Sequence, residues 1–240
     1  MILTFQSTLL EKKSLTGNVY FFRFARPADP VWTFQAGQYL IFHIPSKDAH
    51  AVRRLYSIAS PPQQKDSLDF IIELLPQGIG SDYLRQIAIG QAIAMQGPAG
   101  MFTLKPSPRP KVFLVTGTGI APARSIFLSI NATEGYLFWG LKTAADVYFF
   151  EELKNLKNCV FKLCLSRETD LAKKLKPPDL AFTTIGHVTQ GLEEMINKKQ
   201  KNYSEFDYYL CGGNRIVESL RLYLSQLRVP APQVFFEKFN

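Results

Sequence analysis

Short apolar runs, each bounded by polar and turn-forming residues, follow one another through the first part of the chain. Thr16-Gly17-Asn18 and Pro61-Pro62 are typical of the separating turns. Strands at this spacing, without long helices between them, predict a sandwich or barrel. One helix is expected over residues 81–87, because Ser81 is a good N-cap and Asp82 suits the positive helix start. The expected strands lie at 19–24, 39–44, 55–59, 68–75 and 92–96.

The pattern changes after a proline-rich connector, Lys105-Pro106-Ser107-Pro108-Arg109-Pro110, which is stiff and extended. From Lys111 onward, apolar runs alternate with amphipathic segments, which predicts βαβ units and a parallel sheet. We therefore expect two domains, with residues 1–106 in the first and 111–240 in the second. The expected strands are 112–116, 136–140, 160–166, 208–211 and 234–237, and the expected helices lie near 123–130, 146–155, 192–198 and 215–227.

The ends of the expected parallel strands carry residues suited to ligand binding. Gly117, Gly140, Ser166 and Cys211 each stand where an expected strand finishes. Open parallel sheets bind ligands beyond the carboxyl ends of their strands. We therefore expect a ligand site at this edge of the second domain.

Composition is that of a globular protein. The chain has 240 residues, 46% hydrophobic and 20% charged, enough for one large packed domain or two of ordinary size. Its net charge of +8 favours acidic partners, but the lysine runs are too short for a nucleic-acid tail. No apolar run is long enough for a membrane span, and residues 1–10 lack the centre of a signal peptide.

The cysteines and histidines do not have the spacing of a metal site. Cys159, Cys164 and Cys211 include no Cys-x-x-Cys pair, and the three histidines share no ligand-like spacing. We therefore expect no metal or iron–sulfur cluster held by the chain. Few cysteines, in an odd number, are typical of a reducing compartment, so we expect a cytoplasmic protein.

The most suggestive chemistry of the first domain is the tetrapeptide Arg54-Leu55-Tyr56-Ser57 on an expected strand. An arginine binds a diphosphate through two-pronged contacts, a tyrosine stacks on a flat ring, and a serine hydroxyl forms hydrogen bonds. By itself the tetrapeptide is equally compatible with an exposed strand that forms one salt bridge. Gly78-Ile79-Gly80-Ser81 then opens the expected helix, where free N–H groups and the helix dipole favour an anion.

A glycine turn, Gly117-Thr118-Gly119-Ile120-Ala121-Pro122, joins the first expected parallel strand to a helix. Glycines let the backbone turn sharply and approach a diphosphate, and Pro122 fits the first helical turn. An ordinary strand-to-helix turn is the alternative interpretation of this segment alone.

Taken in order, these motifs resemble those of the ferredoxin–NADP reductase-like flavoprotein superfamily. The R-x-Y-S/T motif matches at Arg54, Tyr56 and Ser57, and the G-x-x-S turn matches at Gly78 and Ser81. The G-P-x-G-x-F motif matches at 97–102, G-x-G-x-A-P at 117–122, and the C-G turn at 211–214. The resemblance implies a flavin-binding antiparallel Greek-key β-barrel followed by an α/β parallel-sheet nucleotide-binding domain.

The resemblance also implies roles for residues of the first domain. Arg54 would bind the flavin phosphates, Tyr56 would stack on the flavin ring, and Ser57 would face flavin N5. The helix start at Gly78, Gly80 and Ser81 would bind the phosphates as well. FAD is the expected flavin and FMN the alternative.

In the second domain, the resemblance assigns the coenzyme diphosphate to Gly117, Thr118, Gly119 and Pro122. Lys142 stands where the family has arginine, which keeps the charge but loses the planar fork. Ser166 and Arg167 match a pair that holds the 2′-phosphate of NADPH in related reductases, so NADPH is favoured over NADH. The alternative for Arg167 is an ion pair with a neighbouring carboxylate.

The remaining implied roles concern the hydride path. Cys211 would lie against the nicotinamide, followed by the turn residues Gly212 and Gly213. Glu237 would act there together with Ser57, and Phe239 would shield the flavin. A buried strand-end thiol is the alternative interpretation of Cys211.

The resemblance implies an NAD(P)H-dependent oxidoreductase that passes hydride to FAD and then electrons to a separate acceptor. An acidic one-electron acceptor, such as a ferredoxin or an iron–sulfur oxygenase component, suits the charge of +8. Two alternatives stay open. One is an NAD(P)H:flavin reductase that releases reduced flavin, and the other is a non-catalytic electron-transfer subunit or interaction protein with this fold.

Overall fold

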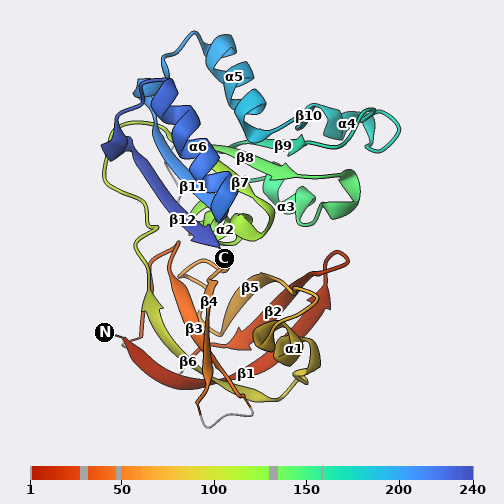
Figure 1. Ribbon diagram of the computed structural model, residues 1–240, viewed down its shortest axis with the longest axis vertical. Helices are drawn as coiled ribbons and strands as arrows, with labels where there is room; N and C mark the ends of the chain where they lie inside the picture. Colours follow the sequence, from red (N-terminus) through yellow and green to blue (C-terminus); the bar gives the residue numbers. More distant parts are fainter. Residues whose placement is uncertain (1, 28–31, 47–49, 130–134, 158, 240) are drawn as a thin grey trace. The chain divides into compact units, whose positions relative to one another are not determined.

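The computed structural model describes residues 2–27, 32–46, 50–129, 135–157 and 159–239 (Figure 1). The chain forms two compact units. The first contains Met1–Leu104 and Ala121–Ser129, and the second contains Lys105–Ile120 and Ile130–Asn240. Residues 121–129 thus group with the first unit, although the sequence prediction has them in the second domain.

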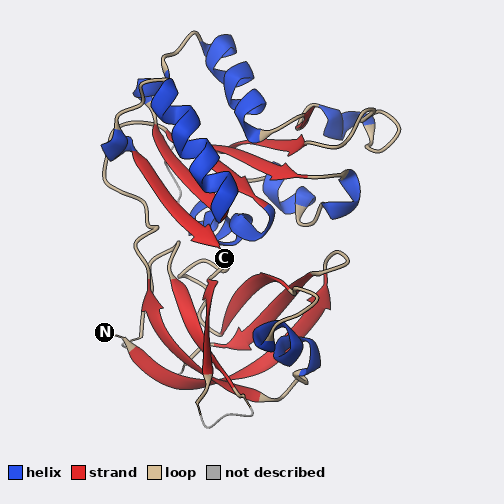
Figure 2. Cartoon of the chain, in the orientation of Figure 1, coloured by secondary structure: helices blue, strands red, loops and turns tan. Residues whose placement is uncertain are grey.

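The first unit is built on one six-stranded antiparallel sheet with the order β4-β3-β6-β1-β2-β5. Figure 2 draws the strands in red. An antiparallel bridge between Ile58 and Phe70 joins the two ends of this order, so the sheet curls into a barrel. The predicted β architecture is confirmed. The strands are β1 (Leu3–Ser14), β2 (Val19–Ala25), β3 (Tyr39–Ile44), β4 (Val52–Ser57), β5 (Ser67–Glu73) and β6 (Ala92–Ala99).

Aromatic rings fill the barrel interior. Phe24, Phe42 and Phe70 are fully buried and meet edge to face, with ring centroids 5.0–6.0 Å apart. Edge-to-face contacts of this kind stabilise a core by about 0.5–1.5 kcal/mol each beyond their burial. Much of the phenylalanine content of the first half is therefore core.

Strand β1 is an element that the sequence prediction lacks. Its odd-numbered residues Leu3, Phe5, Ser7 and Leu9 are more buried than their even-numbered neighbours. The buried Ser7 hydroxyl donates a hydrogen bond to the carbonyl of Ala25 at 2.6 Å. The two-residue alternation was therefore present, but the polar residues between the apolar ones concealed it.

Helix α1 (Ile79–Gln86) begins earlier than predicted, and Ser81 is not its N-cap. Gly78 occupies the cap position with φ 144°, and no side chain caps the helix start. The Ser81 hydroxyl instead accepts a hydrogen bond from the backbone N–H of Leu75 at 3.0 Å. Glycine takes the cap position because its φ is one that other residues rarely adopt.

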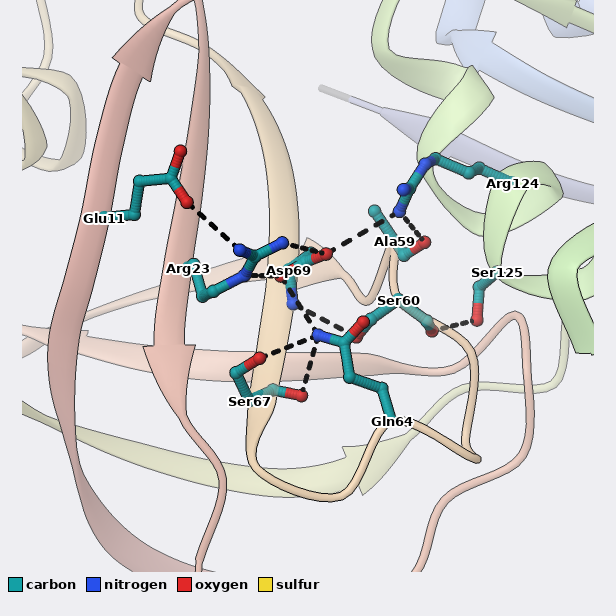
Figure 3. Close-up of polar contacts among 9 residues, drawn as sticks. All are labelled: Glu11, Arg23, Ala59, Ser60, Gln64, Ser67, Asp69, Arg124 and Ser125. Atoms are coloured by element: carbon teal, nitrogen blue, oxygen red, sulfur yellow. Dashed lines mark hydrogen bonds and ion pairs between the residues drawn. The ribbon is translucent and has the colours of Figure 1, made fainter. Parts of the chain in front are cut away.

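Helix α2 (Ile120–Ser129) is joined to the β4–β5 connection by side-chain hydrogen bonds (Figure 3). Arg124 donates to the carbonyl of Ala59 at 2.8 Å, and the Ser125 hydroxyl donates to the carbonyl of Ser60 at 2.6 Å. Both side chains are buried. These bonds explain why residues 121–129 group with the first unit.

A buried carboxylate lies beside this attachment. Asp69, on β5, is 1% exposed and forms ion pairs with Arg23 at 2.8 Å and with Arg124 at 3.8 Å (Figure 3). Gln64 donates to the same carboxylate at 3.2 Å, and Glu11 pairs with Arg23 from the exposed side at 3.1 Å. A carboxylate this deeply buried needs such partners, since an unpaired buried charge is strongly destabilising.

The second unit contains a six-stranded parallel sheet with the order β10-β9-β8-β7-β11-β12 (Figure 1). The predicted α/β class is confirmed. Its strands are β7 (Lys111–Thr116), β8 (Gly135–Leu141), β9 (Cys159–Leu165), β10 (Thr183–Ile185), β11 (Asp207–Gly213) and β12 (Val234–Phe239). Its helices are α3 (Phe150–Lys154), α4 (Pro177–Leu180), α5 (Val188–Lys199) and α6 (Asn214–Gln226).

Helices α5 and α6 cover one face of this sheet. Leu192 and Ile196 of α5 share a buried cluster with Leu220 and Leu224 of α6 and with alternate residues of the strands. Helix α3 packs on β9, where Phe150 contacts Phe161 edge to face at 5.8 Å. Phe161 has the opposite parity along β9 to the buried cluster residue Cys164, so α3 lies on the other face.

Three segments of the second unit differ from the prediction. The helix predicted over 146–155 is a 3-10 turn at Ala144–Asp146 followed by α3 (Phe150–Lys154). Phe149, with φ 52°, interrupts the two, and nothing in the sequence signals this conformation for a phenylalanine. The short elements α4 and β10 were not predicted, because each spans too few residues for a repeating apolar pattern to be recognised.

Candidate functional site

In the first unit, the structure brings together residues of the two predicted flavin-binding motifs. A Cβ built on Gly80, in the first turn of α1, would lie 3.0 Å from Cγ of Arg54 and 3.2 Å from the Tyr56 hydroxyl. Arg54 and Tyr56 lie on β4, two residues apart, so they share one side of the strand. A larger residue here would require the Arg54 and Tyr56 side chains to shift by a few tenths of an ångström, so glycine suits this close approach of α1 to the strand.

Tyr56 is held by packing on one ring. It contacts Phe42 edge to face, with centroids 4.9 Å apart and an interplanar angle of 77°. Burial raises the pKa of the Tyr56 hydroxyl to about 12, although the charge of Arg54 opposes this. The phenol is therefore neutral at physiological pH, so that it can donate a hydrogen bond beside the exposed Arg54 guanidinium.

The start of α1 is suited to an anion. Its first N–H groups have no side-chain cap, and a Cβ on Gly78 would meet nothing within 4 Å. Lys12 donates from β1 to the carbonyls of Arg85 and Ile87, at 2.7 and 3.3 Å, and so satisfies the other helix end. Open backbone donors, the helix dipole and Arg54 together form a cradle that fits the diphosphate of a flavin nucleotide.

Ser57 is the last residue of β4 and is 7% exposed. It lies opposite Tyr39 in the β3–β4 register. Ser57 belongs to the first unit, whereas the other two predicted catalytic residues, Cys211 and Glu237, belong to the second.

In the second unit, the glycine turn and the cysteine turn touch each other. A Cβ on Gly119 would lie 2.4 Å from the carbonyl oxygen of Cys211, and one on Gly212 would lie 2.3 Å from the Thr116 hydroxyl. The contact follows from topology, because β7 and β11 are neighbouring parallel strands with Cys211 opposite Val115. The two predicted nicotinamide-nucleotide motifs therefore lie side by side at the carboxyl ends of β7 and β11.

The outer surface of this edge is open. A Cβ on Gly117 or on Gly213 would meet nothing within 4 Å, and Gly117 has φ 54°. Pro122, in the first turn of α2, is buried, as expected for a residue that needs no N–H partner there. Backbone that combines tight glycine packing with an open outer side fits the diphosphate of a dinucleotide.

Cys211 and Glu237 are brought together on neighbouring strands. They lie opposite each other in the β11–β12 register, and the next pairs place Gly213 opposite Phe239. Burial, together with the negative charge of Glu237, holds the pKa of the Cys211 thiol well above its ordinary value of 9.0. Cys211 is therefore a neutral thiol, not a nucleophilic thiolate.

The raised pKa of the Cys211 thiol predicts how its alkylation depends on pH. Because burial disfavours the thiolate, Cys211 should resist alkylation by iodoacetamide in the folded protein even at about pH 9, where an ordinary thiol is at least half ionised. Mass spectrometry should find Cys211 unlabelled in the folded protein and labelled after unfolding in urea. Labelling of folded protein that rises through the ordinary thiol range would contradict the assignment.

The loops after β8 and β9 are joined where the coenzyme ribose is predicted to bind. The N–H of Arg167 donates to the carbonyl of Lys142 at 2.8 Å, and Glu168 accepts from the N–H of Ala144 at 2.8 Å. The N–H of Ser166 donates to the carbonyl of Leu141 at 3.0 Å. Arg167 and Lys142 are exposed, and Arg167 forms no ion pair with any residue that the structure describes.

Two residues of this site were missed from the sequence. Trp139, on β8, donates its indole N–H to the carbonyl of Gly117 at 3.0 Å, and the Tyr148 hydroxyl donates to the same oxygen at 3.3 Å. The signal available was a tryptophan directly before the strand-end residue Gly140. From the sequence, a tryptophan at this position is interpreted as a core residue. The apolar pattern does not show which group its indole N–H contacts.

Within the described ranges, no group of three or more histidine, cysteine, aspartate or glutamate residues is arranged to hold a metal ion. Across the same part of the chain, no helix combines the length and apolar character needed to cross a membrane.

Comparisons with known proteins identify the type of domain in each half of the chain. Residues 6–104 match the family model for an oxidoreductase FAD-binding domain, and residues 113–221 match the model for an oxidoreductase NAD-binding domain. The chain is 32% identical over 246 aligned positions to ferredoxin–NADP reductase B of Sorangium cellulosum, covering 98% of each protein.

Two other relatives extend the comparison. The chain is 31% identical to the reductase component of propane 2-monooxygenase from Mycolicibacterium smegmatis, covering 90% of this chain but only 62% of that relative. The crystal structure of Amycolatopsis cytochrome P450 reductase GcoB superposes with a TM-score of 0.83 at 25% identity, covering 99% of this chain and 70% of the other. The chain therefore belongs to the ferredoxin–NADP reductase-like family of flavoprotein oxidoreductases, with a FAD-binding domain followed by an NAD-binding domain.

Proposed function

We propose that the protein is an NAD(P)H-dependent flavoprotein reductase that delivers electrons to a separate one-electron acceptor. The observation that carries this proposal is the presence of two anion cradles on one chain. One combines Arg54 with the start of α1, and the other combines Gly117 with the turn after Cys211. When bound, the cofactors supply the redox step, in which hydride passes from the nicotinamide ring to the flavin.

The residues of the first unit would hold the flavin. Arg54 and the backbone at Gly78, Gly80 and Ser81 bind the phosphates, and the Ser81 hydroxyl still has a proton to donate after accepting from Leu75. Tyr56 stacks on the flavin ring, and Ser57 faces the atom that receives the hydride. The 1–106 segment acts as the flavin domain in this proposal.

Residues of the second unit, together with Pro122 from the segment 121–129 that groups with the first unit, would hold the coenzyme. Gly117, Thr118, Gly119 and Pro122, with Gly212 and Gly213, position the diphosphate and nicotinamide. The neutral Cys211 thiol contacts the nicotinamide beside Glu237, without ionising, and Phe239 covers the flavin ring. The 111–240 segment acts as the coenzyme domain.

The proposed acceptor is an acidic protein, such as a ferredoxin or an iron–sulfur oxygenase component. The net charge of +8 supports electrostatic steering toward such a partner. The relatives named as a ferredoxin–NADP reductase and as the reductase component of a monooxygenase support the same class of partner. The sparse cysteines support a cytoplasmic location.

Anaerobic stopped-flow reduction tests the proposal. Purified protein should be yellow, retain flavin through gel filtration, and bleach when mixed with NADPH or NADH. Reduced protein should then transfer electrons to a small acidic ferredoxin, more slowly at high salt. Loss of flavin during filtration would favour a flavin reductase, and a protein that neither binds flavin nor bleaches would overturn the proposal.

The coenzyme preference depends on Arg167. The exposed guanidinium has no carboxylate partner among the described residues, which supports a role with the 2′-phosphate of NADPH. Arg167→Ala should lower kcat/KM for NADPH by about 10- to 100-fold, the effect expected from losing one charge-assisted hydrogen bond to phosphate. The value of kcat/KM for NADH should stay nearly unchanged. Steady-state kcat/KM with each coenzyme measures this, and equal losses with both would refute the role.

A further inference from the structure

Several donors converge on one backbone carbonyl in the glycine turn of the second unit. The oxygen of Gly117 accepts from the Trp139 indole N–H at 3.0 Å and from the Tyr148 hydroxyl at 3.3 Å. The N–H of Ile120 also points to this oxygen within the 3-10 turn Gly117–Gly119. An ordinary turn needs only the last of these bonds, so the two side-chain donors call for an explanation.

The two side chains are fixed by the core of the second unit. Trp139 lies on β8 opposite Val115 of β7 and is fully buried, whereas Tyr148 precedes α3 and is 6% exposed. Their rings meet edge to face, with centroids 4.8 Å apart and an interplanar angle of 73°. Because packing fixes both rings, their donors are directed at Gly117 before any ligand binds.

Fixing this carbonyl also fixes the neighbouring N–H. In a trans peptide, the C=O of one residue and the N–H of the next point in opposite directions. With the Gly117 oxygen held by Trp139 and Tyr148, the N–H of Thr118 must point away from both rings. The N–H of Ile120 also holds this oxygen, and the two side-chain bonds add to it at a glycine, φ 54°, whose backbone is less restricted than that of other residues.

We infer that Trp139 and Tyr148 are positioning residues for the diphosphate of the nicotinamide dinucleotide. They act through the Gly117–Thr118 peptide and hold its N–H in the orientation that an anion requires. The inference rests on the proposed function, because it takes the glycine turn as the diphosphate site. Neither side chain needs to touch the coenzyme.

The variant Tyr148→Phe tests the inference, because it removes one hydroxyl and keeps the ring contact with Trp139. Tyr208→Phe is the matched control. The Tyr208 hydroxyl also donates to a backbone carbonyl, that of Tyr203 at 2.8 Å, from a fully buried ring of the same sheet. Tyr208 lies near the start of β11, away from the strand end that carries Cys211.

Calorimetry on the flavin-loaded protein should give a Kd for NADP⁺ or NAD⁺ raised about 3- to 10-fold in Tyr148→Phe, as expected for one lost hydrogen bond, and unchanged in Tyr208→Phe. Trp139→Phe should act in the same direction. At saturating NADPH, the rate of flavin reduction should return to that of the wild type, since only binding is affected. Binding of 2′-AMP, which has no diphosphate, should be unaffected.

The outcomes separate the inference from the proposed function. If wild-type protein binds no nicotinamide dinucleotide, the proposed function fails. If the wild type binds but Tyr148→Phe binds equally well, the inference fails and the proposed function stands. If Tyr148→Phe and Tyr208→Phe lower the affinity for the dinucleotide equally, Trp139 and Tyr148 have only a structural role and the inference is overturned. The same conclusion follows if Tyr148→Phe also lowers the affinity for 2′-AMP.

Discussion

Gly119→Ala should slow reduction of the flavin by NAD(P)H about 100-fold, the effect expected from a displacement of about 1 Å in a reacting group. The new Cβ would lie 2.4 Å from the carbonyl oxygen of Cys211 and 2.6 Å from its carbonyl carbon. Both are backbone atoms of β11, so no side-chain rotation relieves the overlap. The glycine turn, the cysteine turn or both must move.

Flavin binding separates this effect from general unfolding. The Gly119 contact lies wholly within the second unit, so the flavin should remain bound to the first. Gly17→Ala is a suitable control, because a Cβ there meets nothing within 4 Å and the backbone needs no positive φ. Stopped-flow absorbance gives the rate, and wild-type rates in Gly119→Ala would show that the turn does not position the coenzyme.

The division of the chain into a β half and an α/β half followed from the apolar pattern together with the proline-rich connector at 105–110. Runs such as Val19–Ala25 (β2) and Lys111–Thr116 (β7) are nearly continuous in apolar character, because both of their faces are largely buried. Strand β1 escaped prediction because only alternate residues are apolar and a serine occupies one buried position. Alternation is the weaker signal when a polar residue stands on the core side.

The candidate site was predictable where backbone conformation demands glycine. Positive φ values occur at Gly78 and Gly117, and close neighbours surround Gly80 and Gly119. A glycine in the sequence is therefore a direct sign of the backbone conformation at these four positions. The hydrogen-bond partners were not predictable in the same way. Trp139 donates to Gly117 from a neighbouring strand, and only the register of the β7–β8 ladder brings them together.

The grouping of residues 121–129 with the first unit could not be predicted from their position in the sequence. Helix α2 follows β7 directly, so its sequence position suggests a helix that belongs with the parallel sheet. Its buried Arg124 instead bonds to Ala59 and faces Asp69, far away along the chain. A lone aspartate within the apolar strand Ser67–Glu73 was the available sign that a buried cation would be its partner.

Asp69→Asn should lower the free energy of unfolding of the first unit by about 3 kcal/mol, because it removes the buried carboxylate that forms ion pairs with both Arg23 and Arg124. The Asp69 side chain is 1% exposed and Arg124 only 9%, so water does not replace the lost charge. Glu11→Gln makes the same chemical change on the other carboxylate that pairs with Arg23. Glu11 is 44% exposed, so its loss should cost less than about 1 kcal/mol.

Urea unfolding followed by tryptophan fluorescence measures both variants. The chain has two tryptophans, Trp32 in the first unit and Trp139 in the second, so a Trp139→Phe background makes the signal report the first unit alone. The transition should shift strongly to lower urea in Asp69→Asn and hardly at all in Glu11→Gln. Equal midpoints for the two variants would mean that the buried carboxylate does not hold helix α2 and the barrel together, since Asp69 forms an ion pair with Arg124 whereas Glu11 pairs with Arg23.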